Sequence, residues 1–114
     1  NSKKHGRKNQ IEGSYENNQK VVVIEDLIST GNSSLVAVDA LREAKLQVKG
    51  MISIFTYGFP ISYENFEKKK VTLNTLSSYD ILLEQALLSN YINDNEFKIL
   101  SKWKENPKDW NPNN

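Results

Sequence analysis

The distribution of apolar and polar positions along this chain predicts alternating strands and helices. Short apolar runs rich in β-branched residues predict three strands, at residues 21–24, 48–57 and 71–76. Apolar residues at helical spacing follow each strand and predict helices at residues 33–44, 62–70, 79–90 and 95–105. This order is typical of a parallel sheet flanked by helices, so we expect an α/β fold.

The pattern also divides the chain into three segments. Residues 1–20 are polar and basic, residues 21–76 form the expected α/β core, and residues 77–114 hold two helices and a polar tail. A length of 114 residues suits a single domain. The chain starts without methionine in a segment rich in anion-binding groups, so we expect a processed end or a fragment whose upstream part is missing.

Composition narrows the class of protein. The 38% hydrophobic and 25% charged residues are ordinary for a soluble globular domain, and no apolar run approaches a membrane span. The net charge of +1 points to neither nucleic acid nor acidic substrates. The absence of cysteine excludes disulfides, a thiolate nucleophile and cysteine-based zinc sites. We expect a cytoplasmic protein with no membrane or nucleic-acid partner.

The most informative segment is 21–34, where the first apolar run ends in Glu25 and Asp26. In open α/β sheets, ligands bind beyond the carboxyl ends of the strands. Two adjacent carboxylates at such an end can accept hydrogen bonds from a vicinal ribose diol. They can also draw a hydrated Mg²⁺ toward a diphosphate. We therefore expect a phosphorylated sugar at this end of the strand.

The turn that follows favours a phosphate site. It offers successive backbone N–H groups, hydroxyl groups and the positive end of the next helix, with Asn32 or Ser33 as the expected N-cap; its residues are Ser29, Thr30, Gly31, Asn32 and Ser33. Gly31 permits a positive φ or a close approach. Neither a Walker A loop nor a G-x-G-x-x-G motif is present, which favours a ribose 5-phosphate compound over a nucleoside triphosphate. A buried strand and a capped helix without ligand would explain the valines, but not the paired acids.

Segment 21–34 resembles the phosphoribosyl pyrophosphate (PRPP) motif of the type I phosphoribosyltransferases. Other segments resemble the orotate phosphoribosyltransferases in particular. These are Lys3-Lys4-His5-Gly6 with the strand expected near Ile11, Phe55-Thr56-Tyr57-Gly58, residues 78–103, and Asn106-Pro107-Lys108-Asp109-Trp110. The resemblance spans nearly the whole chain, but it corresponds to the C-terminal part of a longer enzyme, without the N-terminal hood. The 114 residues alone are therefore expected to have little activity.

The resemblance implies a Mg²⁺-dependent transfer that converts orotate and PRPP to orotidine 5′-monophosphate and pyrophosphate, in UMP synthesis. It implies that Glu25 and Asp26 bind the ribose hydroxyls, and that Asp26 favours the positive charge on the ring. Residues 29–33 hold the 5′-phosphate, with Ser29 also near orotate. Lys3 and His5, with Lys4 beside them, belong to a mobile loop that closes over the diphosphate, often in the site of the partner subunit, which implies a homodimer. No direct protein ligand to the metal is implied.

Several alternatives stay open at this point. Lys4 contacts the diphosphate or only keeps the loop soluble, and the latter is favoured for Arg7 and Lys8. Tyr57 faces the base or packs under a loop, and no arginine near it can meet the orotate carboxylate. A purine or uracil phosphoribosyltransferase would share 21–34 but not the loop. A regulatory PRPP-binding domain would lose Lys3 and His5, so their presence favours an enzyme.

Overall fold

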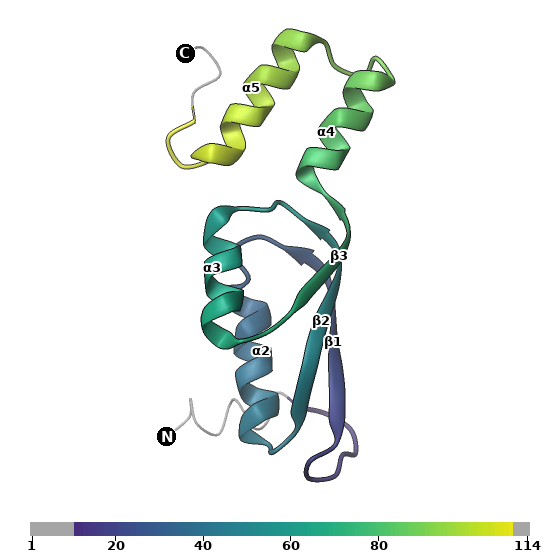
Figure 1. The fold of residues 1–114 in the computed structure, drawn as a ribbon, viewed down its shortest axis with the longest axis vertical. Helices are drawn as coiled ribbons and strands as arrows, with labels where there is room; N and C mark the ends of the chain where they lie inside the picture. Colours follow the sequence, from purple (N-terminus) through teal and green to yellow (C-terminus); the bar gives the residue numbers. More distant parts are fainter. Residues whose placement is uncertain (1–10, 111–114) are drawn as a thin grey trace.

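The computed structural model describes residues 11–110, which form a three-stranded parallel sheet with helices (Figure 1). The elements are β1 (Lys20–Ile28), α2 (Asn32–Glu43), β2 (Gln47–Thr56), α3 (Pro60–Lys69), β3 (Leu73–Ser78), α4 (Tyr79–Leu88) and α5 (Asp94–Glu105). The strands lie in the order β1-β2-β3, and both neighbouring pairs are parallel. The expected α/β fold with a parallel sheet is confirmed. None of the described helices is long and apolar enough to cross a membrane.

The core lies between the sheet and the pair α2 and α3, which cover the same face (Figure 1). Its buried members are Ile28, Leu35, Val38, Met51, Phe66 and Val71. Both helices lie on one face because the strand order advances in a single direction. Right-handed crossovers then place successive helices on the same side.

The opposite face of the sheet corrects one expectation. The β-branched run of β1 predicts a strand buried on both faces, but Ile24 of β1 is 69% exposed and Leu76 of β3 is 75% exposed. Val22, Ile52 and Ile54 are also exposed. Among the described residues, no helix covers this face. The apolar run in β1 indicates that both faces of the strand are suited to burial. Which face of the sheet α2 and α3 cover depends instead on the order of the strands.

Several element boundaries also differ from the predictions. β1 continues to Ile28, so Glu25 and Asp26 lie inside the strand instead of just after it. α3 begins at Pro60, because proline suits the first helical turn, where its missing N–H is not needed. Ile11 lies in an irregular segment, not in a strand.

An aromatic cluster fastens the pair α4 and α5 to the carboxyl end of the sheet. Tyr57 lies 5.3 Å from Phe59, 5.5 Å from Trp103 and 5.9 Å from Tyr79 between ring centroids. The Tyr79 hydroxyl donates to the Leu100 carbonyl at 2.9 Å. Lys104 of α5 pairs with Asp80 of α4 at 2.8 Å. Tyr57 therefore packs against rings from α4 and α5 and against Phe59, and not under a loop as one of its two expected roles had it.

The buried ring of Tyr79 predicts a pH dependence of stability. Burial, the neighbouring Tyr57 and the Asp80 carboxylate raise the pKa of Tyr79 above the ordinary value of 10.0. The folded state therefore favours the neutral phenol. The resulting stabilisation is complete below pH 10.0 and is lost as the pH rises through the raised pKa of the folded state.

We expect Tyr79→Phe to lower the free energy of unfolding by a constant amount at every pH, because the hydrogen bond to Leu100 is lost. The variant should also lose less stability at alkaline pH, because it has no phenol to ionise. Urea unfolding at neutral pH and above pH 10.0 measures the free energy of unfolding and its change with pH. Tyr63→Phe is the matched control, because Tyr63 is 60% exposed. Equal alkaline slopes for the Tyr79→Phe variant and the unmodified protein would contradict the assignment.

Candidate functional site

The predicted site lies at the carboxyl edge of β1 and β2. Ile28 pairs with Thr56 at the end of the two strands, and the N–H of Tyr57 donates to the Ile28 carbonyl at 3.1 Å. The hydroxyl of Thr56 accepts from the N–H of Gly58 at 3.1 Å and so fixes the turn after β2. These hydrogen bonds fix the end of β1 against β2. Only residues 29–31 separate the end of β1 from the start of α2.

Gly31 is the N-cap of α2, with φ 87° and no side-chain cap. The expected N-cap, Asn32 or Ser33, is therefore wrong, while the expected positive φ is confirmed. A Cβ at this position would lie 2.7 Å from Cε2 of the Phe66 ring. A residue with a side-chain cap cannot occupy a site that needs both a left-handed backbone and room for a ring.

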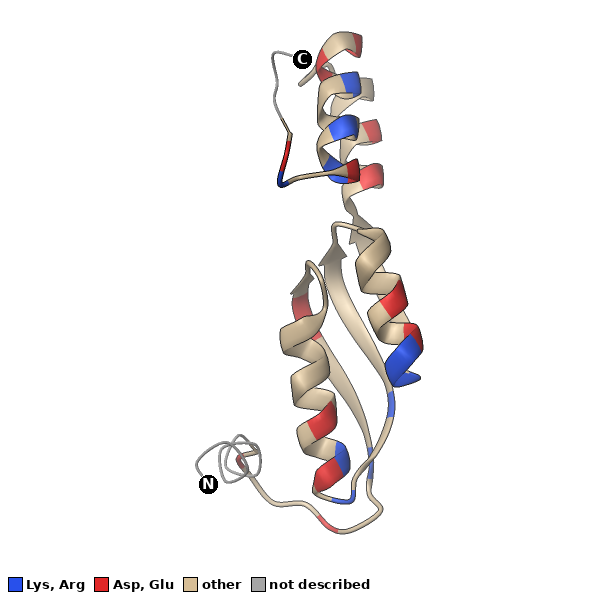
Figure 2. Ribbon diagram, turned by 90° about the vertical axis from the view of Figure 1, so that its left-hand side faces the viewer, with Lys and Arg blue, Asp and Glu red and all other residues tan. Residues whose placement is uncertain are grey.

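The first turn of α2 presents backbone N–H groups that the protein leaves without an acceptor. The helical ladder begins with Leu35, whose N–H donates to the Gly31 carbonyl at 2.9 Å. Within residues 11–110, the N–H groups of Gly31, Ser33 and Ser34 donate to no protein oxygen. No acidic residue lies in this turn, and the charged residues of α2 and α3 lie further along each helix (Figure 2). Such a helix end binds anions, phosphate in particular.

Glu25 and Asp26 lie on opposite faces of the sheet, because successive strand residues alternate. Glu25 is on the face of α2, where one carboxylate oxygen accepts a hydrogen bond from the Ser34 hydroxyl at 2.5 Å. Ser34 is itself only 3% exposed. Asp26 is exposed on the uncovered face. The two acids that look equivalent in the sequence thus differ in environment: one is fixed under a helix and the other is open.

The structure places Glu25 on the same side of the sheet as α2, where it contacts Ser34 next to residues 29–33, while Asp26 follows it in β1 on the other face. Ser34 is a contact that sequence reasoning missed, because a serine one position further into the helix looks like an ordinary first-turn residue. The predicted loop residues Lys3, Lys4 and His5 lie outside the described residues, as do Arg7 and Lys8.

No protein cage for a metal ion is seen in the described part of the chain. Residues 11–110 hold no group of three or more acidic, histidine or cysteine side chains arranged for a metal ion. The exposed Asp26 carboxylate still leaves room for a hydrated Mg²⁺ that arrives on a substrate phosphate, which is how Mg²⁺ commonly binds. The described residues fit such an ion only as part of a substrate complex.

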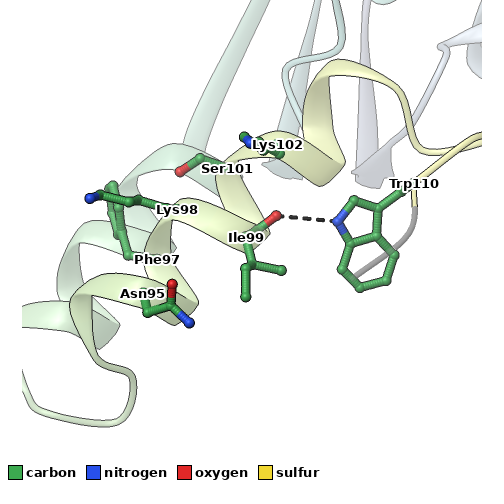
Figure 3. A pocket seen from close by; sticks show the side chains of 7 residues that line it. All are labelled: Asn95, Phe97, Lys98, Ile99, Ser101, Lys102 and Trp110. Atoms are coloured by element: carbon green, nitrogen blue, oxygen red, sulfur yellow. Dashed lines mark hydrogen bonds between the residues drawn. The ribbon is translucent and has the colours of Figure 1, made fainter. Parts of the chain in front are cut away.

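A cavity on α5 lies apart from this site (Figure 3). Its volume is about 400 Å³, and its lining residues are Asn95, Phe97, Lys98, Ile99, Ser101, Lys102 and Trp110. The indole N–H of Trp110 donates to the Ile99 carbonyl at 3.3 Å, so the tail packs against the helix. None of the predicted site residues lines this cavity.

Known proteins resemble this chain in sequence and in structure. No protein-family model matches the chain. The chain is 51% identical over 108 residues to an orotate phosphoribosyltransferase of Cytophaga hutchinsonii, a match that covers 95% of this chain and 52% of that protein. The chain spans about half the length of the curated relatives that it matches.

Solved structures share the fold. The match to a Leishmania donovani UMP synthase covers 82% of this chain and 21% of that chain, with a TM-score of 0.70 and 24% identity. The match to a Mycobacterium tuberculosis orotate phosphoribosyltransferase in complex with PRPP covers 62% of this chain and 42% of that chain, with a TM-score of 0.56 and 30% identity. The match to a Leishmania donovani adenine phosphoribosyltransferase covers 60% of this chain and 32% of that chain, with a TM-score of 0.55 and 25% identity. The fold is that of the type I phosphoribosyltransferases.

The contact between Gly31 and Phe66 predicts an unusual cost for a single methyl group. We expect Gly31→Ala to lower the free energy of unfolding of the full-length protein by about 2 to 4 kcal/mol, from backbone strain together with overpacking. Urea unfolding measures the loss.

Gly13→Ala is the matched control, because Gly13 also has a positive φ, 102°, but a methyl group there would have no neighbouring atom within 4 Å. It carries the strain without the clash, so it should cost only about 1 kcal/mol. Equal losses for the two variants would show that the Phe66 ring moves aside freely.

Proposed function

Because the chain is homologous to the orotate phosphoribosyltransferases, we propose that the full-length protein transfers the phosphoribosyl group of PRPP to orotate. The products are orotidine 5′-monophosphate and pyrophosphate, in the synthesis of UMP. The observation that carries this proposal is the strand, loop and helix of residues 20–43. There an acidic pair and an anion-binding helix end lie at one edge of a parallel sheet.

The 5′-phosphate of PRPP fits the start of α2. Among residues 11–110, no protein oxygen accepts from the N–H groups of Gly31 and Ser33, and the same turn carries the hydroxyl groups of Ser29, Thr30 and Ser33. The helix dipole adds favourable charge. Ser29 is the first residue after β1, and we assign it a contact with orotate on the strength of the family resemblance. Asn32 completes the loop.

The two acids serve the ribose in this proposal. Glu25 is oriented by Ser34, so its second carboxylate oxygen remains for a ribose hydroxyl. Asp26 has an exposed carboxylate that can bind the other hydroxyl. As the glycosidic bond to the diphosphate breaks, positive charge grows on the ribose ring. A nearby carboxylate then stabilises the transition state more than the ground state.

The leaving diphosphate needs positive charge. We assign this role to Lys3 and His5, with Lys4 beside them, on the strength of the loop resemblance. Mg²⁺ bound to the diphosphate would neutralise part of its charge. The same resemblance supports a homodimer in which the loop reaches the partner site, and a cytoplasmic enzyme.

A second candidate is another type I phosphoribosyltransferase, using a purine or uracil. The adenine enzyme shares the fold, so the fold does not select the base. The high identity to orotate enzymes over nearly the whole chain favours orotate. A regulatory protein that binds PRPP would retain the phosphate-binding loop of residues 29–33. Only a measurement of turnover distinguishes such a regulator from an enzyme.

The assay is the loss of orotate absorbance when the full-length protein is mixed with orotate, PRPP and Mg²⁺. We expect turnover with orotate and none with adenine, hypoxanthine, guanine or uracil. Turnover of one of those bases without orotate would overturn the assignment, and PRPP binding without any turnover would indicate the regulator. The 114-residue chain alone should be nearly inactive.

The role of Asp26 predicts a large kinetic effect. We expect Asp26→Asn to lower kcat by about a hundredfold, because it removes a charge that stabilises the transition state, with little change in the KM for orotate. Steady-state kinetics in the full-length protein measure both. Glu84→Gln on α4 removes an exposed carboxylate far along the chain and should leave kcat unchanged. A kcat that falls less than threefold (on the order of 0.6 kcal/mol) in Asp26→Asn would refute the role.

A further inference from the structure

One side chain of α3 reaches the proposed phosphate loop from outside the motif. The amide nitrogen of Asn65 donates to the Thr30 carbonyl at 3.0 Å and to Oδ1 of Asn32 at 3.2 Å. Asn65 is partly buried, although it lies on a helix with several exposed residues. It therefore bridges the residue before Gly31 and the residue after it.

The bond to Thr30 fixes the direction of a neighbouring N–H group. In a trans peptide, the carbonyl of one residue and the N–H of the next point in opposite directions. The described residues contain no cis peptide bond. Since the Thr30 carbonyl points to Asn65, the Gly31 N–H points away from α3. It is held as a free donor, because no protein oxygen in residues 11–110 accepts from it.

α3 is itself held firmly along α2, so Asn65 is a fixed support. The Phe66 ring packs against Gly31 at one end of the contact. At the other end, Lys69 pairs with Asp39 at 2.9 Å. Arg42 also donates to the carbonyls of Lys69 and Lys70, at 2.6 and 3.2 Å. The two helices are thus joined next to Asn65, at Phe66, and again one turn further along α3, at Lys69 and Lys70.

We infer that Asn65 is a positioning residue: it orients the Thr30–Gly31 peptide so that its N–H faces the 5′-phosphate of the ligand. This inference rests on the proposed function, because it assigns the phosphate loop to PRPP. Asn65 does not touch the ligand. It acts through the backbone, so its loss should weaken binding of the 5′-phosphate and leave binding of the diphosphate alone unchanged.

The test compares ligands that share only one end of PRPP. Ribose 5-phosphate carries the 5′-phosphate, and pyrophosphate carries only the diphosphate. We expect Asn65→Asp in the full-length protein to weaken ribose 5-phosphate and PRPP by the same factor, about tenfold, as judged by calorimetry. Pyrophosphate affinity and the KM for orotate should stay the same. Asn32 can rotate its amide to donate to the new carboxylate, but the Thr30 carbonyl loses its donor.

Asn65→Ala is the second variant, and it should show the same pattern of affinities. Glu67→Ala, an exposed change on the same helix, should alter none of the affinities. Thermal unfolding of each variant accompanies the calorimetry. Because each affinity is compared within one variant, a general loss of folded protein would lower the active fraction for every ligand and would not produce the selective pattern.

The outcomes separate this inference from the proposed function. PRPP binding and orotate turnover by the unmodified protein, with unchanged ribose 5-phosphate affinity in both Asn65 variants, would overturn the inference and leave the function standing. Equal weakening of ribose 5-phosphate and pyrophosphate would also overturn it. Failure of the unmodified protein to bind PRPP would overturn both. Selective weakening of the 5′-phosphate ligands would support it.

Discussion

The close contact between Gly31 and the Phe66 ring is the constraint on which the rest of the site depends. The absence of a Cβ lets the chain turn with φ 87° directly after β1 and lets α3 approach the start of α2. A Cβ at this position would lie 2.7 Å from Cε2 of Phe66, so the ring or the helix that carries it would have to shift. The Asn65 bridge to Thr30 and Asn32 is made across the same approach. The geometry of the loop proposed to bind phosphate therefore depends on the packing of the two helices.

The same contact explains why an N-cap side chain is missing where one is usual. A capping hydroxyl or amide satisfies an N–H group of the first helical turn. Here that turn keeps the N–H groups of Gly31, Ser33 and Ser34 free of protein acceptors within residues 11–110. A conventional cap would stabilise α2 but would occupy an N–H group that we propose binds the phosphate. The helix start is thus less satisfied than stability alone would favour, as is common at functional sites.

The elements of the fold were predictable because each depends on a local pattern. The alternation of β-branched runs with helical spacing predicts the parallel sheet. The acids near the end of β1 and the small polar residues after it predict the edge at which a ligand is proposed to bind. The contacts that shape the edge were not predictable in this way. Asn65 lies 35 residues from Thr30, and nothing in its own helix distinguishes it from a surface asparagine. The uncovered face follows from strand order and crossover handedness, which an apolar run does not encode.

Glu25 and Asp26 differ in how they are tied to the loop that is proposed to bind phosphate. Glu25 is bound by Ser34, and Ser34 lies in the same helical turn that offers N–H groups to a phosphate. A shift of α2 would therefore move the contacts proposed for the ribose and for the phosphate together. Asp26 lies on the other face, where the described helices provide no neighbour, so its carboxylate is not tied to that movement. Successive residues of a strand point to opposite faces of the sheet. Glu25 is therefore held in one orientation, while the carboxylate of Asp26 is free to approach the positive charge that is proposed to develop on the ribose ring.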